Sequence, residues 1–93
     1  MKFVWDTGKA KANWRKHKIA FEEATTVFYD PLAKIMDDPD HSDSENRFIL
    51  IGHSQKRNLL FVVHVYTKEE NIIRIISARK ATKRERRAFE EVS

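Results

Sequence analysis

The sequence predicts a small α+β protein in which two helices precede an antiparallel sheet and a third helix follows it. Three apolar segments, Arg47–His53, Leu59–Tyr66 and Ile72–Ala78, are joined by short polar turns, which is typical of an antiparallel meander. Apolar residues at helical spacing precede these segments, and a capping-box sequence follows them. Helices packed against such a sheet make an α+β sandwich. Because 93 residues are too few for a second core, we expect residues 1–93 to form a single domain.

The first thirty residues predict an edge strand and two helices. Phe3–Trp5 is a short apolar strand, after which Asp6 or Thr7 can cap a helix over Lys9–His17. A second helix is expected over Phe21–Tyr29, because the residue before Pro31 avoids the helical conformation. The expected apolar faces of the two helices are Ala10, Asn13, Trp14 and His17, and Phe21, Ala24, Val27 and Phe28.

The remaining elements follow from residue type. Leu32–Met36 is expected to be a short strand, and residues 37–46 form an acidic loop. The β-branched residues of Ile72–Ala78 favour a central strand. Thr82 and Glu85 have the capping-box spacing, so we expect the last helix to run from there to about Val92, anchored through Phe89.

Charge is distributed unevenly along the chain. Residues 1–46 have 7 Lys/Arg and 9 Asp/Glu, a net charge of −2, whereas residues 47–93 have 11 and 5, a net charge of +6. Such asymmetry indicates either a polyanionic partner, nucleic acid first, or a solvated basic helix. The chain has no cysteine, which excludes disulfides, thiol nucleophiles and cysteine zinc clusters and suits a reducing cytoplasm. We expect neither a signal peptide nor a membrane span, because the longest apolar run is only Leu59–Val63.

The sequence resembles the BrnT family of toxins over nearly its whole length. The most specific segment is Ile-Arg-Ile-Ile-Ser-Ala-Arg, residues 73–79, and the match continues through Lys80 and Ala81 to Glu85 and Arg86. The other matching positions are Lys9, Ala10, Asn13, Lys16, His17, Phe21 to Ala24, Val27, Phe28, His41, Ser42, Glu45, Arg47 and Gly52 to Ser54.

The resemblance implies a RelE-like fold and a ribonuclease that stops translation by cutting RNA, without a cofactor. It also implies a BrnA-like antitoxin with a ribbon-helix-helix part, expected to form a 2:2 heterotetramer that binds operator DNA. Two positions depart from the family pattern at helix ends. Lys18 stands where the family often has glycine, and Ala20 stands where it often has a capping Ser or Thr.

Cleavage of RNA through its 2′-hydroxyl requires arginines to stabilise charge on phosphorus and a titratable group to move protons. With the family match, we expect Arg74, Arg79 and Glu45 to be catalytic. Strict alternation along a strand places residues 74 and 79 on opposite faces, so a bulge, or a strand that ends near Ser77, is needed to direct both to one phosphate. A partly exposed edge-strand arginine is the alternative for Arg74, and a solvated loop residue or a partner of the acidic segment is the alternative for Arg79.

The expected substrate-binding residues are basic or can titrate near neutral pH: Arg47, Lys16, His41, His53 and Lys80. Arg47 and Glu45 are equally well explained as a surface ion pair. His17 is expected to pack at a helix end, His64 to be a core histidine, and Tyr66 to belong to the core or to stack on a base. The acidic loop at residues 37–45 lacks the glycine of a calcium-binding loop, so we expect no metal.

Three functions remain open at this point. The first is a toxin ribonuclease, in which the six basic residues between Arg79 and Arg87 form a track for RNA phosphates. The second is a non-catalytic nucleic-acid-binding module with the same basic surface. The third is an interaction protein that only binds a DNA-binding antitoxin. Cleavage of RNA by the pure protein separates the first function from the other two.

Overall fold

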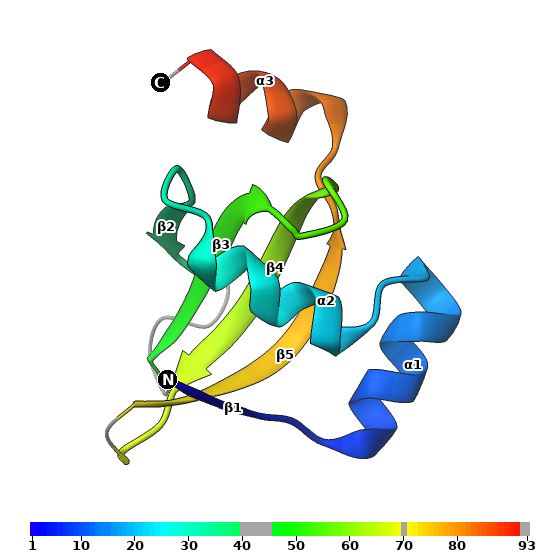
Figure 1. Ribbon diagram of the computed structural model, residues 1–93, viewed down its shortest axis with the longest axis vertical. Coiled ribbons are helices and arrows are strands. Elements are labelled where there is room, and N and C mark those ends of the chain that lie inside the picture. The colour runs from blue at the N-terminus through cyan, green and yellow to red at the C-terminus, as the bar shows by residue number, and fades with distance from the viewer. Residues whose placement is uncertain (40–45, 70, 92–93) are drawn as a thin grey trace.

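A computed structural model describes residues 1–39, 46–69 and 71–91 of the chain. Its centre is a five-stranded sheet in the order β1-β5-β4-β3-β2 (Figure 1). The strands are β1 (Lys2–Val4), β2 (Lys34–Asp37), β3 (Arg47–His53), β4 (Leu59–Tyr66) and β5 (Ile72–Lys80). Strands β2 to β5 form the predicted antiparallel meander, whereas β1 pairs in parallel with β5. The expected edge strand is therefore confirmed, and β5 is central along the part that pairs with β1.

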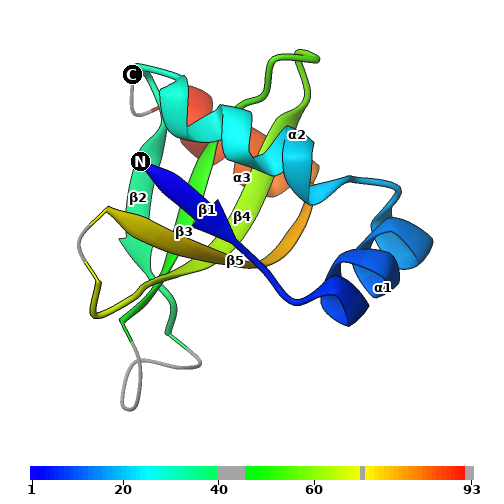
Figure 2. The ribbon, with the colours of Figure 1, turned by 60° about the horizontal axis from the view of Figure 1, so that its bottom comes forward.

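The helices lie on both faces and at one edge of the sheet. Helix α1 (Thr7–His17) lies beside β5, while α2 (Phe21–Thr26) and the 3₁₀ turn η1 (Val27–Tyr29) cross one face (Figure 1). Helix α3 (Lys83–Glu91) lies on the opposite face, behind the sheet in Figure 2. The structure is therefore an α+β sandwich with three α-helices in its described part.

Two apolar clusters hold these layers together. The larger one joins α2 and η1 to the sheet and contains Phe21, Ala24 and Val27, as predicted, with Leu60 and Ile75 among the strand residues. A smaller cluster on the other face holds α3 through Phe89, which packs against Ile51 and Leu59. Phe89 is the predicted anchor of the last helix.

A β-bulge in β5 changes which side chains share a face. Val63 pairs with Ser77, but the next residue, His64, pairs with Ile75, so Ile76 is an extra residue in β5. Arg79 is opposite Phe61 and Arg74 is opposite Val65, and alternation places Phe61 and Val65 on the same face of β4. Arg74 and Arg79 therefore lie on one face, which we call the α3 face because α3 packs on it.

Helix α1 packs against the edge of β5 and is held there by the buried side chain of Asn13. The Asn13 amide nitrogen donates to the carbonyls of Ile19 and Ala78, at 2.9 and 2.8 Å, and its oxygen accepts from the Ala78 N–H at 3.0 Å. The side chain thus pairs with β5 as the backbone of a neighbouring strand would. Trp14 was predicted on the same apolar face, and that prediction is wrong, because 52% of its surface is exposed.

Several element ends differ by a few residues from the prediction. The second helix tightens into a 3₁₀ turn over Val27–Tyr29, and the second strand begins at Lys34 rather than Leu32. Asp6 is the N-cap of α1 and accepts the Lys9 N–H at 2.9 Å. Lys18 ends α1 in the left-handed conformation (φ 58°), and Ala20 begins α2 without a side-chain cap. None of the described helices is long and apolar enough to cross a membrane.

Candidate functional site

The predicted residues Arg74 and Arg47 meet in one hollow at the junction of β1, α1 and the sheet. The hollow has a volume of about 510 Å³. Its polar side chains are Lys9, Arg47, Arg74 and Asp6, and its apolar walls are Val4, Trp5, Ile75 and Ile76. Three cations thus surround a space with only one carboxylate among the described lining residues.

Strand register places the two arginines in one row. Val4 is opposite Arg74, Arg74 is opposite Val65, and Val65 is opposite Arg47. Because neighbouring strands are about 4.8 Å apart, the backbones of Arg47 and Arg74 are separated by roughly 10 Å across β4. Two arginine side chains can reach one phosphate across that gap. Arg74 is exposed, and its side chain makes no hydrogen bond or ion pair with any residue that the structure describes, whereas Arg47 is half-buried.

Six of the eight lining residues were not predicted as part of a site, and Trp5, Asp6 and Lys9 are the most important of them. The Asp6 cap starts α1 directly after β1 and so fixes Lys9 in the first turn of the helix. Trp5 is held by an edge-to-face contact with Phe21, with ring centroids 5.8 Å apart. The parallel pairing of β1 with β5 brings residues 4–9 beside residues 74–76, and no local pattern in the sequence indicates that contact.

Arg79 lies on the same face as Arg74 but is bound elsewhere. Its two terminal nitrogens donate to the two carboxylate oxygens of Glu85, at 2.7 and 2.9 Å, and its guanidinium lies 4.0 Å from the ring centroid of Phe61. Glu85 also accepts the Thr82 N–H, and Thr82 accepts the Glu85 N–H, which confirms the capping box. Hydrogen bonds from Arg79 hold the pKa of Glu85 below its usual value. After allowance for the bulge, about four residue steps separate Arg79 from Arg74, or roughly 13 Å.

The other predicted basic residues lie near the end of β5 or further away. Lys16 is exposed on α1, and Lys80 is exposed at the end of β5, on the face opposite to Arg79. Burial, together with the charges of Lys16 and Arg79, lowers the pKa of the half-buried His17. His17, Lys16 and Arg79 are therefore neighbours, and neither they nor Lys80 line the hollow at Arg74.

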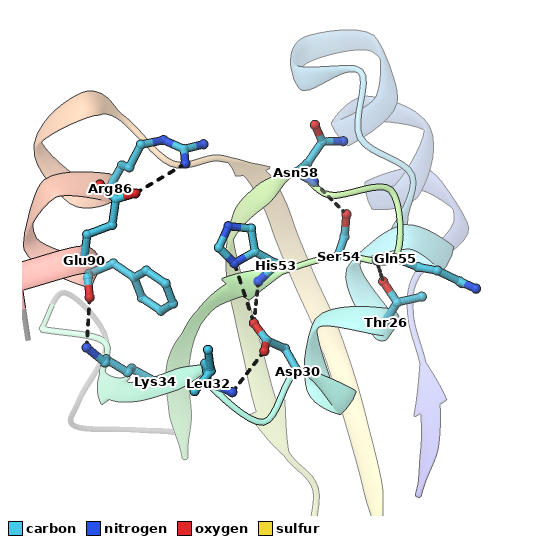
Figure 3. Close-up of polar contacts among 11 residues, drawn as sticks. Thr26, Asp30, Leu32, Lys34, His53, Ser54, Gln55, Asn58, Arg86 and Glu90 are labelled. Carbon is cyan, nitrogen blue, oxygen red and sulfur yellow. Dashed lines mark hydrogen bonds and ion pairs between the residues drawn. The ribbon is translucent and has the colours of Figure 1, made fainter. Parts of the chain in front are cut away.

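His53 lies at the far end of β3 from Arg47. Figure 3 shows it beside Asp30, whose carboxylate accepts the His53 backbone N–H at 2.7 Å and lies 3.9 Å from Nδ1. In the same region Lys34 donates to the Phe89 carbonyl at 2.9 Å and so holds the end of α3. Six residues of extended strand, roughly 20 Å, separate His53 from Arg47. The structure does not bring His53 to the arginine pair.

Two predicted site residues, Glu45 and His41, lie outside the described residues, as does most of the acidic loop. Within the described part of the chain, no group of three or more acidic or histidine side chains is arranged to hold a metal ion.

His64 was predicted to be a core histidine, and it is fully buried. Its ring lies among the rings of Phe28, Phe48 and Tyr66. Nδ1 is 3.4 Å from the Val62 carbonyl, and Nε2 has no hydrogen-bond partner among the residues that the structure describes. Burial lowers the pKa of His64 to about 4, so the ring is neutral at physiological pH. Tyr66 is at the edge of this group with 38% of its surface exposed.

A larger hollow of about 770 Å³ lies on the α2 face. Its walls include Phe28, Ile35, Leu50 and Tyr66, and none of the three predicted arginines lines it. A phosphodiester is recognised by positively charged side chains and not by the size of a hollow. The smaller hollow at Arg74 is therefore the better candidate site. We call it the arginine site.

Comparisons with known proteins identify the family of this chain and a similar fold. A family model described as the ribonuclease toxin BrnT of type II toxin-antitoxin systems matches residues 5–85. Among solved structures, the crystal structure of the Brucella abortus ribonuclease toxin BrnT is similar, with a TM-score of 0.70 and 22% identity over 89% of this chain and 99% of that chain. A search of curated proteins found no match. The family match includes every lining residue of the arginine site except Val4, and it shows that this chain belongs to the BrnT family of type II ribonuclease toxins.

Proposed function

We propose that this protein is an endoribonuclease that cleaves single-stranded RNA at the arginine site, without a metal ion, and thereby inhibits translation in the cytoplasm. The observation that carries the proposal is the convergence of Arg47, Arg74 and Lys9 on one hollow. A phosphodiester placed there meets two planar guanidinium groups, whose fixed donors match phosphate oxygens.

The reaction requires one bond to form and one to break at phosphorus. The ribose 2′-oxygen attacks phosphorus, its proton passes to a base, and the bond to the 5′-oxygen breaks as that oxygen gains a proton. Arg74 and Arg47 stabilise the additional negative charge on the phosphate oxygens. Lys9, at the rim of the same hollow, is the proposed proton donor to the leaving oxygen. Glu45, two residues before Arg47 in the sequence, is the proposed base.

The other predicted residues have supporting roles in the proposal. Lys16 and Lys80, with the exposed basic residues of α3, add positive potential that attracts RNA. His41 and His53 remain predicted substrate contacts. The catalytic role of Arg79 also remains a prediction. The bond to Glu85 occupies both ends of its guanidinium, so we assign it first to holding α3 on the sheet.

A RelE-like toxin needs a partner that blocks it, and type II systems supply an antitoxin protein. We propose a BrnA-like ribbon-helix-helix antitoxin in a 2:2 complex that binds operator DNA. Occlusion of the arginine site by such a partner should bury well over ~1,000 Å². Size-exclusion of the co-expressed pair tests this, and separate elution at micromolar concentration would contradict it.

Substitution of Arg74 tests the cleavage proposal. Arg74→Lys keeps the charge but removes the planar fork, so both Arg74→Lys and Arg74→Ala should lose roughly 10²- to 10³-fold in rate. The matched control is Arg57→Lys, the same change in the exposed turn between β3 and β4. RNA cleavage and melting temperature are measured on the same purified proteins.

Each outcome has a distinct meaning. A folded, fully active Arg74→Ala protein removes Arg74 from the site. An active Arg74→Lys protein with an inactive Arg74→Ala protein reduces its role to general positive charge. A wild-type protein that binds RNA but never cuts it supports the non-catalytic alternative.

A further inference from the structure

Trp14 is the starting observation, because it is exposed where the helix pattern places it in the core. More than half of its surface, 52%, is accessible. A single exposed aromatic ring is common on protein surfaces, so the inference rests on the charge and the groove that surround Trp14.

The helix that carries Trp14 is strongly basic. Residues 7–18 include no acidic residue, and all five of their Lys/Arg side chains are exposed: Lys9, Lys11, Arg15, Lys16 and Lys18. The net charge of −2 over residues 1–46 conceals this concentration, because the acids of that half lie elsewhere. Lys18 also lies near the Trp14 ring, with Nζ 5.9 Å from the centroid.

A groove lies between α1 and the start of α2, beside Trp14. Its volume is about 520 Å³. The apolar walls of the groove are Trp5, Ala10, Trp14 and Phe21. The other lining residues are Lys11, Arg15, Thr7, Ala20 and Glu22. Trp5 also lines the arginine site. The groove and the arginine site are therefore adjoining hollows that share one indole.

We propose that this groove is a second RNA subsite, in which a base next to the cleaved phosphate stacks on Trp14. The inference rests on the proposed function, since it extends the same substrate beyond the arginine site. Lys11, Arg15 and Lys18 hold the flanking phosphates, and Lys18 moves off the ring on its flexible stem as the base arrives. Stacking on an aromatic side chain tolerates any base, so the subsite selects single-stranded RNA rather than a sequence.

The positive charge of α1 and the contact between the groove and the arginine site at Trp5 favour RNA over a protein segment as the occupant of this groove. Residues 7–18 hold five cations and no acid, and Glu22 is the one carboxylate among the described residues that line the groove, so the surroundings favour a polyanion. Trp5 lines both hollows, so a strand bound at the arginine site can continue into the groove. An acidic antitoxin segment with an apolar side chain is the competing occupant, and the experiment separates the two.

The test compares Trp14→Ala and Trp14→Phe with Tyr29→Ala, the loss of another exposed aromatic ring, which lies outside the groove. Fluorescence anisotropy measures binding to a twelve-nucleotide single strand that carries 2′-deoxyribose throughout and cannot be cut. We expect Trp14→Ala to weaken binding by roughly tenfold or more, Trp14→Phe to keep most of the affinity, and Tyr29→Ala to match wild type. Lys11→Ala and Arg15→Ala should each reduce the salt dependence by about one unit of slope.

Cleavage separates this inference from the proposed function. Trp14→Ala should lose efficiency on the twelve-nucleotide RNA and also on a dinucleotide, because both carry a base next to the cleaved phosphate, and the loss should appear as a higher KM with little change in kcat. Binding that depends on Trp14 in a wild-type protein that cuts nothing would support the subsite and refute the proposed activity. Unchanged binding and cleavage in Trp14→Ala would overturn the subsite alone. Loss of antitoxin binding in Trp14→Ala, with RNA binding intact, would assign the groove to the antitoxin instead.

Discussion

His64 should make the stability of this protein depend on pH, and the size of the effect follows from its burial. Burial lowers the pKa of the ring to about 4, whereas the unfolded chain has the ordinary value of 6.5. The unfolded state therefore binds more protons between these values, and stability falls as pH decreases from about 6.5 towards 4. The difference of 2.5 pH units corresponds to about 3 kcal/mol, of which about 2 kcal/mol is already lost at pH 5.

The assay is urea denaturation at pH 7.5, 6, 5 and 4 for wild type and for His64→Leu. Leucine is apolar and of similar volume, and it suits a site formed by Phe28, Phe48 and Tyr66. We expect His64→Leu to lose about 2 kcal/mol less than wild type between pH 7.5 and 5. His53→Gln, which removes an exposed ring at the end of β3, should keep the wild-type dependence. If His64→Leu loses as much stability as wild type, the buried ring is not the acid-sensitive group.

Three further substitutions test how the fold is held. Asn13→Asp keeps the shape of the side chain but removes both N–H donors, so two carbonyls, one of them on Ala78, lose their partner. The free energy of unfolding, measured by urea denaturation at pH 7, should fall by roughly 2–6 kcal/mol. Gly52→Ala would place its Cβ 2.7 Å from the Cβ of Ala33, and this overlap should cost about 1–3 kcal/mol, measured in the same way. Lys18→Gly relieves a left-handed conformation (φ 58°) and should add about 1 kcal/mol, measured as a higher melting temperature.

The sheet could be predicted from sequence because its signals are local. Strands β3 and β4 have the predicted bounds, since apolar residues fill them and polar turns end them. The capping box at Thr82 and Glu85 fixed the start of α3 for the same reason. In each case a few neighbouring residues determine the structure, so no distant contact has to be known.

The site could be predicted only in part because it depends on distant contacts. The sequence pointed to Arg74 and Arg47 as site residues, and the structure brings both to one hollow, but the bulge at Ile76 has no sequence signal in a run of isoleucines. Trp14 has the spacing of a buried residue and yet is exposed, because α1 contacts the edge of the sheet through Asn13 instead of covering its face. Helical periodicity identifies a stripe on a helix, but it does not show how much of that stripe is covered.

The arginine site depends on a short contact between the two ends of the chain. Only three residue pairs join β1 to β5, and Val4 opposite Arg74 is the last of them. Directly after it the chain turns into α1, which contributes Lys9 and then reaches β5 again through Asn13 and Ala78. The position of Lys9 relative to Arg74 is therefore fixed from both sides, by strand pairing before it and by the Asn13 amide after it. The buried amide of Asn13, which does not line the hollow, thus holds the geometry on which the proposed chemistry rests.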